Sequence, residues 1–445
     1  DLFAAMNDIP GTLPVRKVMT ENAVKYLQSM TNERNGDPKF SLELANGLFE
    51  MAKTEGFPNQ PNLGDLRGAQ NVLNLAREMV ELHARQVPND PQIHAREGLL
   101  LASQANITNS LGDVSGAVDY EQRAWDEVQP VLKGPKSNRW MQISTYCFFN
   151  SVYLARDAQF NMADPERALL WINRGEELLL DLGRSKPEFL TRPLYRTQLA
   201  QVRFTKGEML GKLNRDSEAR TYFEQAMHDA DAQNGKDSVE ISKHRRDAHL
   251  YFATFLLSRG DLARATEVSA VLRPPNHSVI AEGKGTFDMV EYGGQTAWWA
   301  ILSAYQGHKQ ESLDNMRKSL AVTRKLREEA PDDMTLVGQH VIDLIDFAEL
   351  PGMDPRQSRA LFVEAIPLAA EFSRVHATVL SAKILEAHAH LGLARLDNQS
   401  HDLASQKVEA ARAIELLEPV VSQRPGLKEL TDLLSAAQKL TEQAT

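Results

Sequence analysis

The feature that most constrains this chain is a turn that returns along it. Residues 63–69 read LGDLRGA, and residues 111–117 read LGDVSGA. Variants of the same turn begin at Gly260 and at Gly307. Glycine tolerates the left-handed backbone that ends many helices, and aspartate accepts hydrogen bonds from the free N–H groups that begin the next helix. The recurrent turn therefore predicts helices that follow one another through short connections.

The spacing of apolar residues agrees with this interpretation. They recur three or four positions apart in nearly every segment, and alternating Val/Ile/Thr-rich runs are almost absent, which favours an all-α chain. Hydrophobic residues make up 42% of the 445 positions, enough for a large core. We expect one pair of helices in each of the ranges 15–55, 66–111, 114–162, 164–213, 215–259, 261–308, 309–350, 355–396 and 403–442. The pairs are offset from the repeat units, so the second helix of a unit begins the next range.

Small and large residues alternate at fixed offsets inside these helices. Ala219, Phe223 and Ala226 form a small–large–small set, and Gly207 lies twelve positions before it. The set returns over 69–76 and 168–175. This pattern resembles the tetratricopeptide repeat (TPR). The resemblance implies TPR-like antiparallel helix pairs, stacked into an irregular right-handed superhelix.

One long irregular stretch, residues 274–292, interrupts the array. It contains two prolines and several glycines, and a loop of this length usually has a function. We interpret it either as a loop that crosses the groove of the superhelix or as a seam between two sub-arrays. The predicted division is an N-terminal array over 1–273, the loop or seam over 274–292, and a C-terminal array over 293–445.

Four motifs in the first third keep a characteristic order. They are DIPGTLPVR at 8–16, AVKYL at 23–27, ELA at 43–45 and NLGDLRGA at 62–69. Together they resemble the TPR region that follows a membrane helix in some bacterial serine/threonine protein kinases, over about residues 1–130. The resemblance implies the sensor or scaffold part of such a kinase, on the extracytoplasmic (periplasmic) side of a membrane, with a kinase domain upstream. The alternative is a cytoplasmic signalling or transcriptional regulator.

Motifs for catalysis and metal binding are missing from the sequence. The run GKGTFD at 283–288 lacks the last glycine of a nucleotide loop, and HRRD at 244–247 has no asparagine five residues on. No zinc-binding HExxH is present, and a single cysteine, Cys147, excludes an internal disulfide. The acidic pairs 176–177 and 332–333 are interpreted as solvated surface. We therefore predict that this chain is not an enzyme and holds no metal or cofactor.

Two groups of side chains are candidates for partner binding. Arg192, Arg196, Arg203 and Lys206 project within one arc of a predicted helix, beside its apolar stripe. Either they pair with acids of a neighbouring helix or reach solvent, or they grip a carboxylate of a partner peptide. Trp298 and Trp299 flank the irregular loop, and their alternatives are core packing or an interface anchor.

The net charge and the hydropathy limit the kinds of partner that we expect. The net charge of −10 disfavours nucleic acid, because nucleic-acid binders usually carry a basic excess. No stretch is long and apolar enough to span a bilayer, so we expect no direct membrane insertion. The predicted function is a non-catalytic superhelix that binds a protein or peptide. A small-molecule sensor, with its ligand beneath the 274–292 loop, is the alternative.

Overall fold

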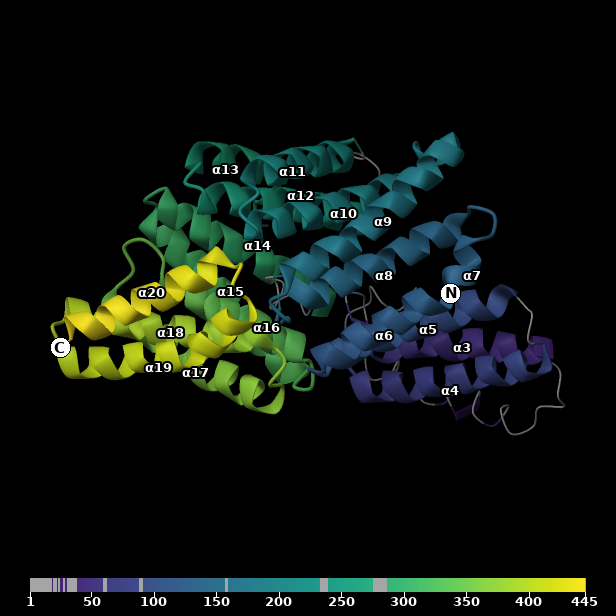
Figure 1. Cartoon of the computed structure of the whole chain (residues 1–445), viewed down its shortest axis with the longest axis horizontal. Coiled ribbons are helices and arrows are strands. Elements are labelled where there is room, and N and C mark those ends of the chain that lie inside the picture. Colours follow the sequence, from purple (N-terminus) through teal and green to yellow (C-terminus); the bar gives the residue numbers. More distant parts are fainter. Residues whose placement is uncertain are drawn as a thin grey trace.

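A computed structural model describes residues 38–58, 62–87, 91–156, 159–232, 239–274 and 286–444, together with Val18, Asn22, Lys25, Tyr26 and Ser29. Within these ranges the regular structure is helical throughout (Figure 1). The α-helices are α3 Pro38–Gly56, α4 Leu66–Gln86, α5 Pro91–Ser110, α6 Val114–Glu127, α7 Gln129–Leu132, α8 Asn138–Ala155, α9 Pro165–Ser185, α10 Pro193–Lys212, α11 Asp216–Asp231, α12 Val239–Ser258, α13 Leu262–Val268, α14 Thr286–Tyr305, α15 Lys309–Glu329, α16 Met334–Ala348, α17 Pro355–Val375, α18 Leu380–Gln399, α19 Leu403–Gln423 and α20 Lys428–Gln443.

The repeated turn has the predicted geometry. Gly64 and Gly112 have φ angles of +79° and +95°, a backbone region that few residues other than glycine adopt. The next aspartate caps the following helix: the Asp65 and Asp113 carboxylates each accept a hydrogen bond of 2.8 Å from a backbone N–H three residues on. Each turn thus ends one helix and starts the next within a few residues.

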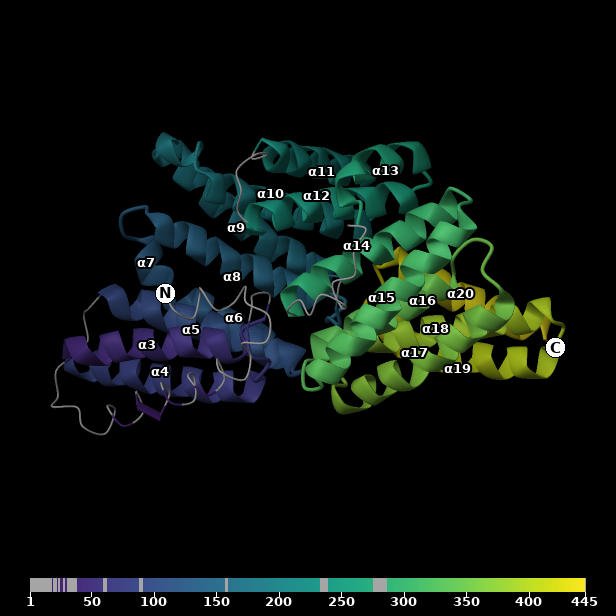
Figure 2. The ribbon, with the colours of Figure 1, turned by 180° about the vertical axis from the view of Figure 1, so that it is seen from behind.

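Successive helices pack as antiparallel pairs, and the pairs stack side by side (Figure 2). The close pairs are α3 with α4, α5 with α6, α8 with α9, α10 with α11, α12 with α13, α14 with α15, α16 with α17, and α18 with α19, while α20 covers the last pair. An all-α helical-repeat superhelix is therefore confirmed. The helix bounds follow the predicted ranges closely from residue 66 onwards.

Small residues allow the close approach within a pair. A Cβ atom added to Gly207 on α10 would lie 3.0 Å from the ring of Phe223 on α11, tighter than ordinary packing. Ala219 and Ala226, on either side of Phe223, are fully buried. The small–large–small set thus acts as the TPR-like pattern predicts.

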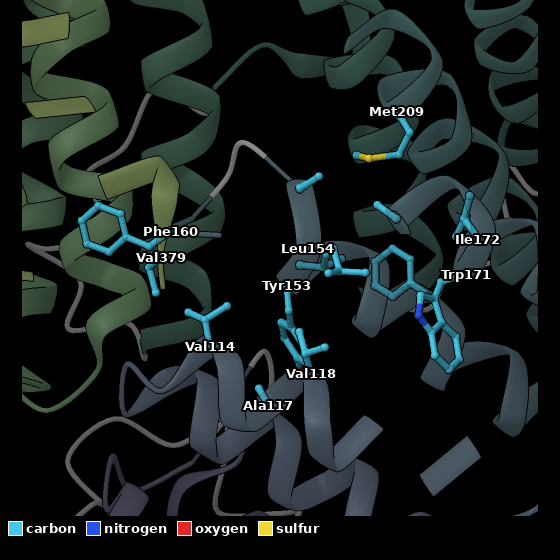
Figure 3. Close-up of a cluster of buried hydrophobic side chains, with 14 of the residues drawn as sticks. Val114, Ala117, Val118, Tyr153, Leu154, Phe160, Trp171, Ile172, Met209 and Val379 are labelled. Atoms are coloured by element: carbon cyan, nitrogen blue, oxygen red, sulfur yellow. The ribbon is translucent and has the colours of Figure 1, made fainter. Parts of the chain in front are cut away.

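The array also folds back on itself. The connection between α8 and α9 packs against α16–α18: the rings of Phe160 and Phe372 lie 4.1 Å apart, and the Asn161 N–H donates to Ser381 Oγ over 2.6 Å. Figure 3 shows Phe160 beside Val379, with Val114 of α6 below them. The largest buried cluster consequently extends from α5 to α18. None of the described helices is both long and apolar enough to cross a membrane.

Candidate functional site

The second half of α10 is electrostatically neutralised. The Lys206 ammonium donates to Glu176 of α9 over 2.6 Å, and Arg203 pairs with Asp229 of α11 and lies 3.6 Å from Glu176. Burial lowers the pKa of Lys206, but its hydrogen bonds to Glu176 and Tyr222 outweigh this, so the pKa is raised. These two cations therefore hold three helices together.

Glu176 corrects one expectation from the sequence. We predicted the pair 176–177 to be solvated, but the side chain of Glu176 is only 8% exposed. Its position on α9 faces α10, where two cations compensate for its loss of water. Asp333, from the other acidic pair, is also not a free surface charge. It accepts a bond of 3.0 Å from the Thr335 N–H and caps α16.

The start of α10 has a different environment. The Arg192 guanidinium lies 3.9 Å above the centre of the Phe189 ring and donates to Asn138 Oδ1 over 3.1 Å. Arg196 donates from Nε to the Leu190 carbonyl over 2.7 Å. Across the described residues, neither arginine forms an ion pair. Their charges face solvent at the turn between α9 and α10.

The bond between Arg192 and Asn138 joins this turn to the start of α8, where a second basic run lies. Lys133, Lys136 and Arg139 belong to that run, and Lys136 pairs with Asp181 and donates to Ser185 Oγ over 2.7 Å. The turn between α9 and α10 and the start of α8 lie on the same side of the molecule (Figure 1). We define the basic edge as Arg96, Lys133, Lys136, Arg139, Arg184, Lys186, Arg192 and Arg196.

Arg96 and Arg139 form the inner part of the basic edge, between α5 and α8. Burial lowers the pKa of the Arg96 guanidinium, and the like charge of Arg139 lowers it further. Glu50 attracts Arg96 weakly, but the Glu50 carboxylate pairs with Lys53 over 2.9 Å. In the part of the chain that the structure describes, no carboxylate forms an ion pair with Arg96 or Arg139. An anion placed between them would relieve their repulsion.

The predicted tryptophan pair lies away from the basic edge, on α14. Trp298 is buried and donates from Nε1 to Ser269 Oγ over 2.9 Å. Trp299 is half-buried, with Arg273 at 6.0 Å from its ring. A role for either in partner binding stays a prediction. Residues 275–285, and with them most of the predicted 274–292 loop and any pocket beneath it, lie outside the described residues.

The cysteine is buried, and two neighbouring histidines of α18 contact carboxylates. Cys147 is buried, and burial raises the pKa of its thiol above the usual range. His388 contacts Glu349 at 3.1 Å, whereas His390 contacts Glu409 at 2.6 Å. Among the described residues, no three His, Cys, Asp or Glu side chains gather as a metal site would need.

The sequence and the fold of this chain can be compared with those of known proteins. No protein-family model matches the sequence, and no curated protein matches it. Among solved structures, the chain is similar to a Rap protein complexed with Competence and Sporulation Factor, with a TM-score of 0.47 and 12% identity over 92% of this chain and 99% of that one. It is also similar to a human IFIT1 dimer with PPP-AAAA, with a TM-score of 0.42 and 13% identity over 96% and 86% of the two chains. For yeast Tom70 the TM-score is 0.30, with 12% identity over 99% and 96%.

Proposed function

We propose that this helical-repeat chain is a non-catalytic scaffold that binds an acidic segment of a partner protein at the basic edge. The observation that carries the proposal is the pair Arg96 and Arg139. Two guanidinium groups lie on neighbouring helices, and neither has an ion-pair partner among the described residues. By contrast, Arg77 of the neighbouring helix α4 pairs with Glu97 of α5 at 2.6 Å.

A carboxylate suits this pair for two physical reasons. A guanidinium presents a planar fork of N–H donors that matches both oxygens of a carboxylate. Arg96 is also partly removed from water, so attraction to an anion is less screened there than at the open surface. Helices α5 and α8 are held in the core, so little ordering of the site is needed when the partner arrives.

The setting that we propose for this scaffold is the extracytoplasmic part of a bacterial serine/threonine kinase. The proposal rests on the four ordered motifs near the N-terminus. Two of them fall on described residues: 43–45 lies within α3, and 62–69 forms the capped turn before α4. The motif at 8–16 and most of 23–27 lie outside the described residues. In this setting the chain would recognise a partner on the outer side of the cytoplasmic membrane.

Binding of an acidic peptide tests the scaffold proposal. The probe is a fluorescein-labelled peptide of alternating Glu and Ser, compared with its Gln/Ser counterpart by anisotropy. We expect the acidic peptide alone to bind, and R96Q/R139Q to weaken it by at least about tenfold, because each charged hydrogen bond contributes about 1.5–3 kcal/mol. The matched control R356Q/R374Q removes two exposed arginines of α17. Equal binding by both double variants would refute the proposed site.

The sequence upstream of Asp1 tests the proposed setting. A kinase domain followed by a membrane helix is the expected result. A DNA-binding domain in that position would instead make the chain part of a cytoplasmic regulator. Either result leaves the peptide experiment valid, because that experiment concerns the basic edge alone.

A further inference from the structure

The turn between α9 and α10 combines exposed apolar side chains with cations. We call residues 184–196 the tip; they include the short 3-10 helix η1, Pro187–Phe189. Leu190 and Leu194 are 44% and 46% exposed, and Pro187 beside them is exposed as well. Isolated exposed leucines are ordinary on protein surfaces, but these lie within one turn at the end of a projecting hairpin (Figure 2).

The charge of the tip is opposite to that of the whole chain. Four cations, Arg184, Lys186, Arg192 and Arg196, share the tip with a single acid, Glu188, and Asp181 just before the tip lies 3.7 Å from Arg184. The whole chain, in contrast, has a net charge of −10. Lys133 and Arg139 of the neighbouring α8 turn extend the positive region. A local basic excess on an acidic protein concentrates attraction for anions in one place.

The tip is held in a fixed shape by its own contacts. Arg192 covers the ring of Phe189, which is buried beneath it. The Tyr195 hydroxyl donates to the Leu179 carbonyl over 2.8 Å, and Arg196 donates a hydrogen bond to the Leu190 carbonyl. The leucines are therefore presented outward without a flexible loop to order, so binding through them loses little conformational entropy.

We propose that the tip docks on an anionic lipid surface. Leucines surrounded by cations match the layers of such a surface, in which hydrocarbon lies beneath a plane of negative headgroups. The contact is peripheral: the two leucines reach the headgroup boundary while the arginines remain among the phosphates. This inference goes beyond the proposed function: it concerns the tip, which is the outer end of the basic edge, whereas the peptide site is argued from Arg96 and Arg139 at its inner part. It holds whether or not the chain binds an acidic peptide.

Vesicle co-sedimentation of the full chain tests the proposal. The probes are vesicles of equal parts phosphatidylglycerol and phosphatidylcholine, and vesicles of phosphatidylcholine alone. We expect binding to the anionic vesicles only. R192Q/R196Q should weaken it by about twenty-fivefold, since each basic residue near an anionic membrane contributes about fivefold in affinity. L190S/L194S should weaken it by about tenfold or more through lost apolar burial.

Matched variants separate this contact from general effects. R356Q/R374Q removes the same charge from α17, and L403S/V408S replaces two exposed apolar residues of α19; both should bind vesicles as the unmodified chain does. A lack of preference for anionic vesicles would overturn the proposal. So would R192Q/R196Q losing the acidic peptide but not the vesicles, because the tip would then be a protein-binding surface. Circular dichroism of each variant confirms that it is folded.

Discussion

The two halves of α10 carry the same kinds of cation in opposite circumstances. Arg203 and Lys206 lie between α9 and α11, where Glu176 and Asp229 neutralise them. Arg192 and Arg196 lie at the tip, where they contact an aromatic ring and a backbone carbonyl and pair with no acid among the described residues. The comparison teaches that a basic stripe on one helix does not identify a binding surface. The acidic side chains that neighbouring helices place beside a cation decide whether that cation remains available for a partner.

The largest effect that would test this comparison is expected from Glu176→Ala. The substitution leaves Lys206 and part of Arg203 without a counter-charge in a largely buried place. We expect a loss of about 3 kcal/mol in the free energy of unfolding, the lower end for a broken buried pair, because Arg203 keeps Asp229. Urea denaturation measures it. Glu188→Ala at the tip is the control and should change stability by less than about 0.5 kcal/mol. Similar losses for the two variants would remove the distinction between the halves of α10.

Alkaline pH should lower the stability that Lys206 contributes in the second half of α10, by less than Glu176→Ala does. The pKa of Lys206 is raised in the folded chain, so its stabilising contribution is complete below the unfolded value of about 10.4. The contribution is lost as the pH rises through the higher folded value. Lys206→Met removes this titration. The difference in unfolding free energy between the two proteins should therefore shrink above about pH 10.4. A difference that stays constant with pH would contradict the ion pair with Glu176.

At the tip, removing both arginines should cost less stability still. Arg192→Ala with Arg196→Ala loses one cation–aromatic contact and two hydrogen bonds at an exposed site, about 1–1.5 kcal/mol in total. Thermal denaturation checks this value. A loss as large as that of Glu176→Ala would mean that the tip arginines serve the fold rather than a partner.

The smallest effect, and the one of opposite sign, is expected at the inner part of the basic edge. Arg139→Gln removes a like charge that lowers the pKa of Arg96. Stability should stay level or rise by up to about 0.5 kcal/mol, as expected when repulsion between partly exposed charges is relieved. Binding of the acidic peptide should fall at the same time. A clear loss of stability would show that Arg139 has a structural partner.

Local patterns made most of the fold predictable. A glycine that ends a helix and an aspartate that begins the next act within a few residues, so the turns at Gly64 and Gly112 could be recognised from the sequence. Gly207, Phe223 and the alanines around it likewise act within one helix pair. The periodicity carries no information on superhelical pitch, however. The contact of Phe160 with Phe372, between residues 212 positions apart, was therefore not foreseen.

The candidate site could be predicted only in part. Arg192 and Arg196 were found because they share one helix, but their separation from Arg203 and Lys206 depends on acids of α9 and α11 that only the packing reveals. The basic run KGPKSNR at 133–139 is visible in the sequence, but it lies in a connection between helices rather than along one helix face. Its proximity to the tip arises from the Arg192–Asn138 contact, between residues 54 positions apart. Arg96 was not identifiable at all, since it is a single arginine on α5 and the sequence does not show that Arg139 of α8 lies beside it.

Hydrogen–deuterium exchange of the full chain, with and without the Glu/Ser peptide, tests most directly the claim that the basic edge is the binding surface. We predict slower exchange over the first turns of α5 and α8, around Arg96 and Arg139, and no change around Arg203 and Lys206. Protection confined to the second half of α10, or to α14 around the two tryptophans, would contradict the claim.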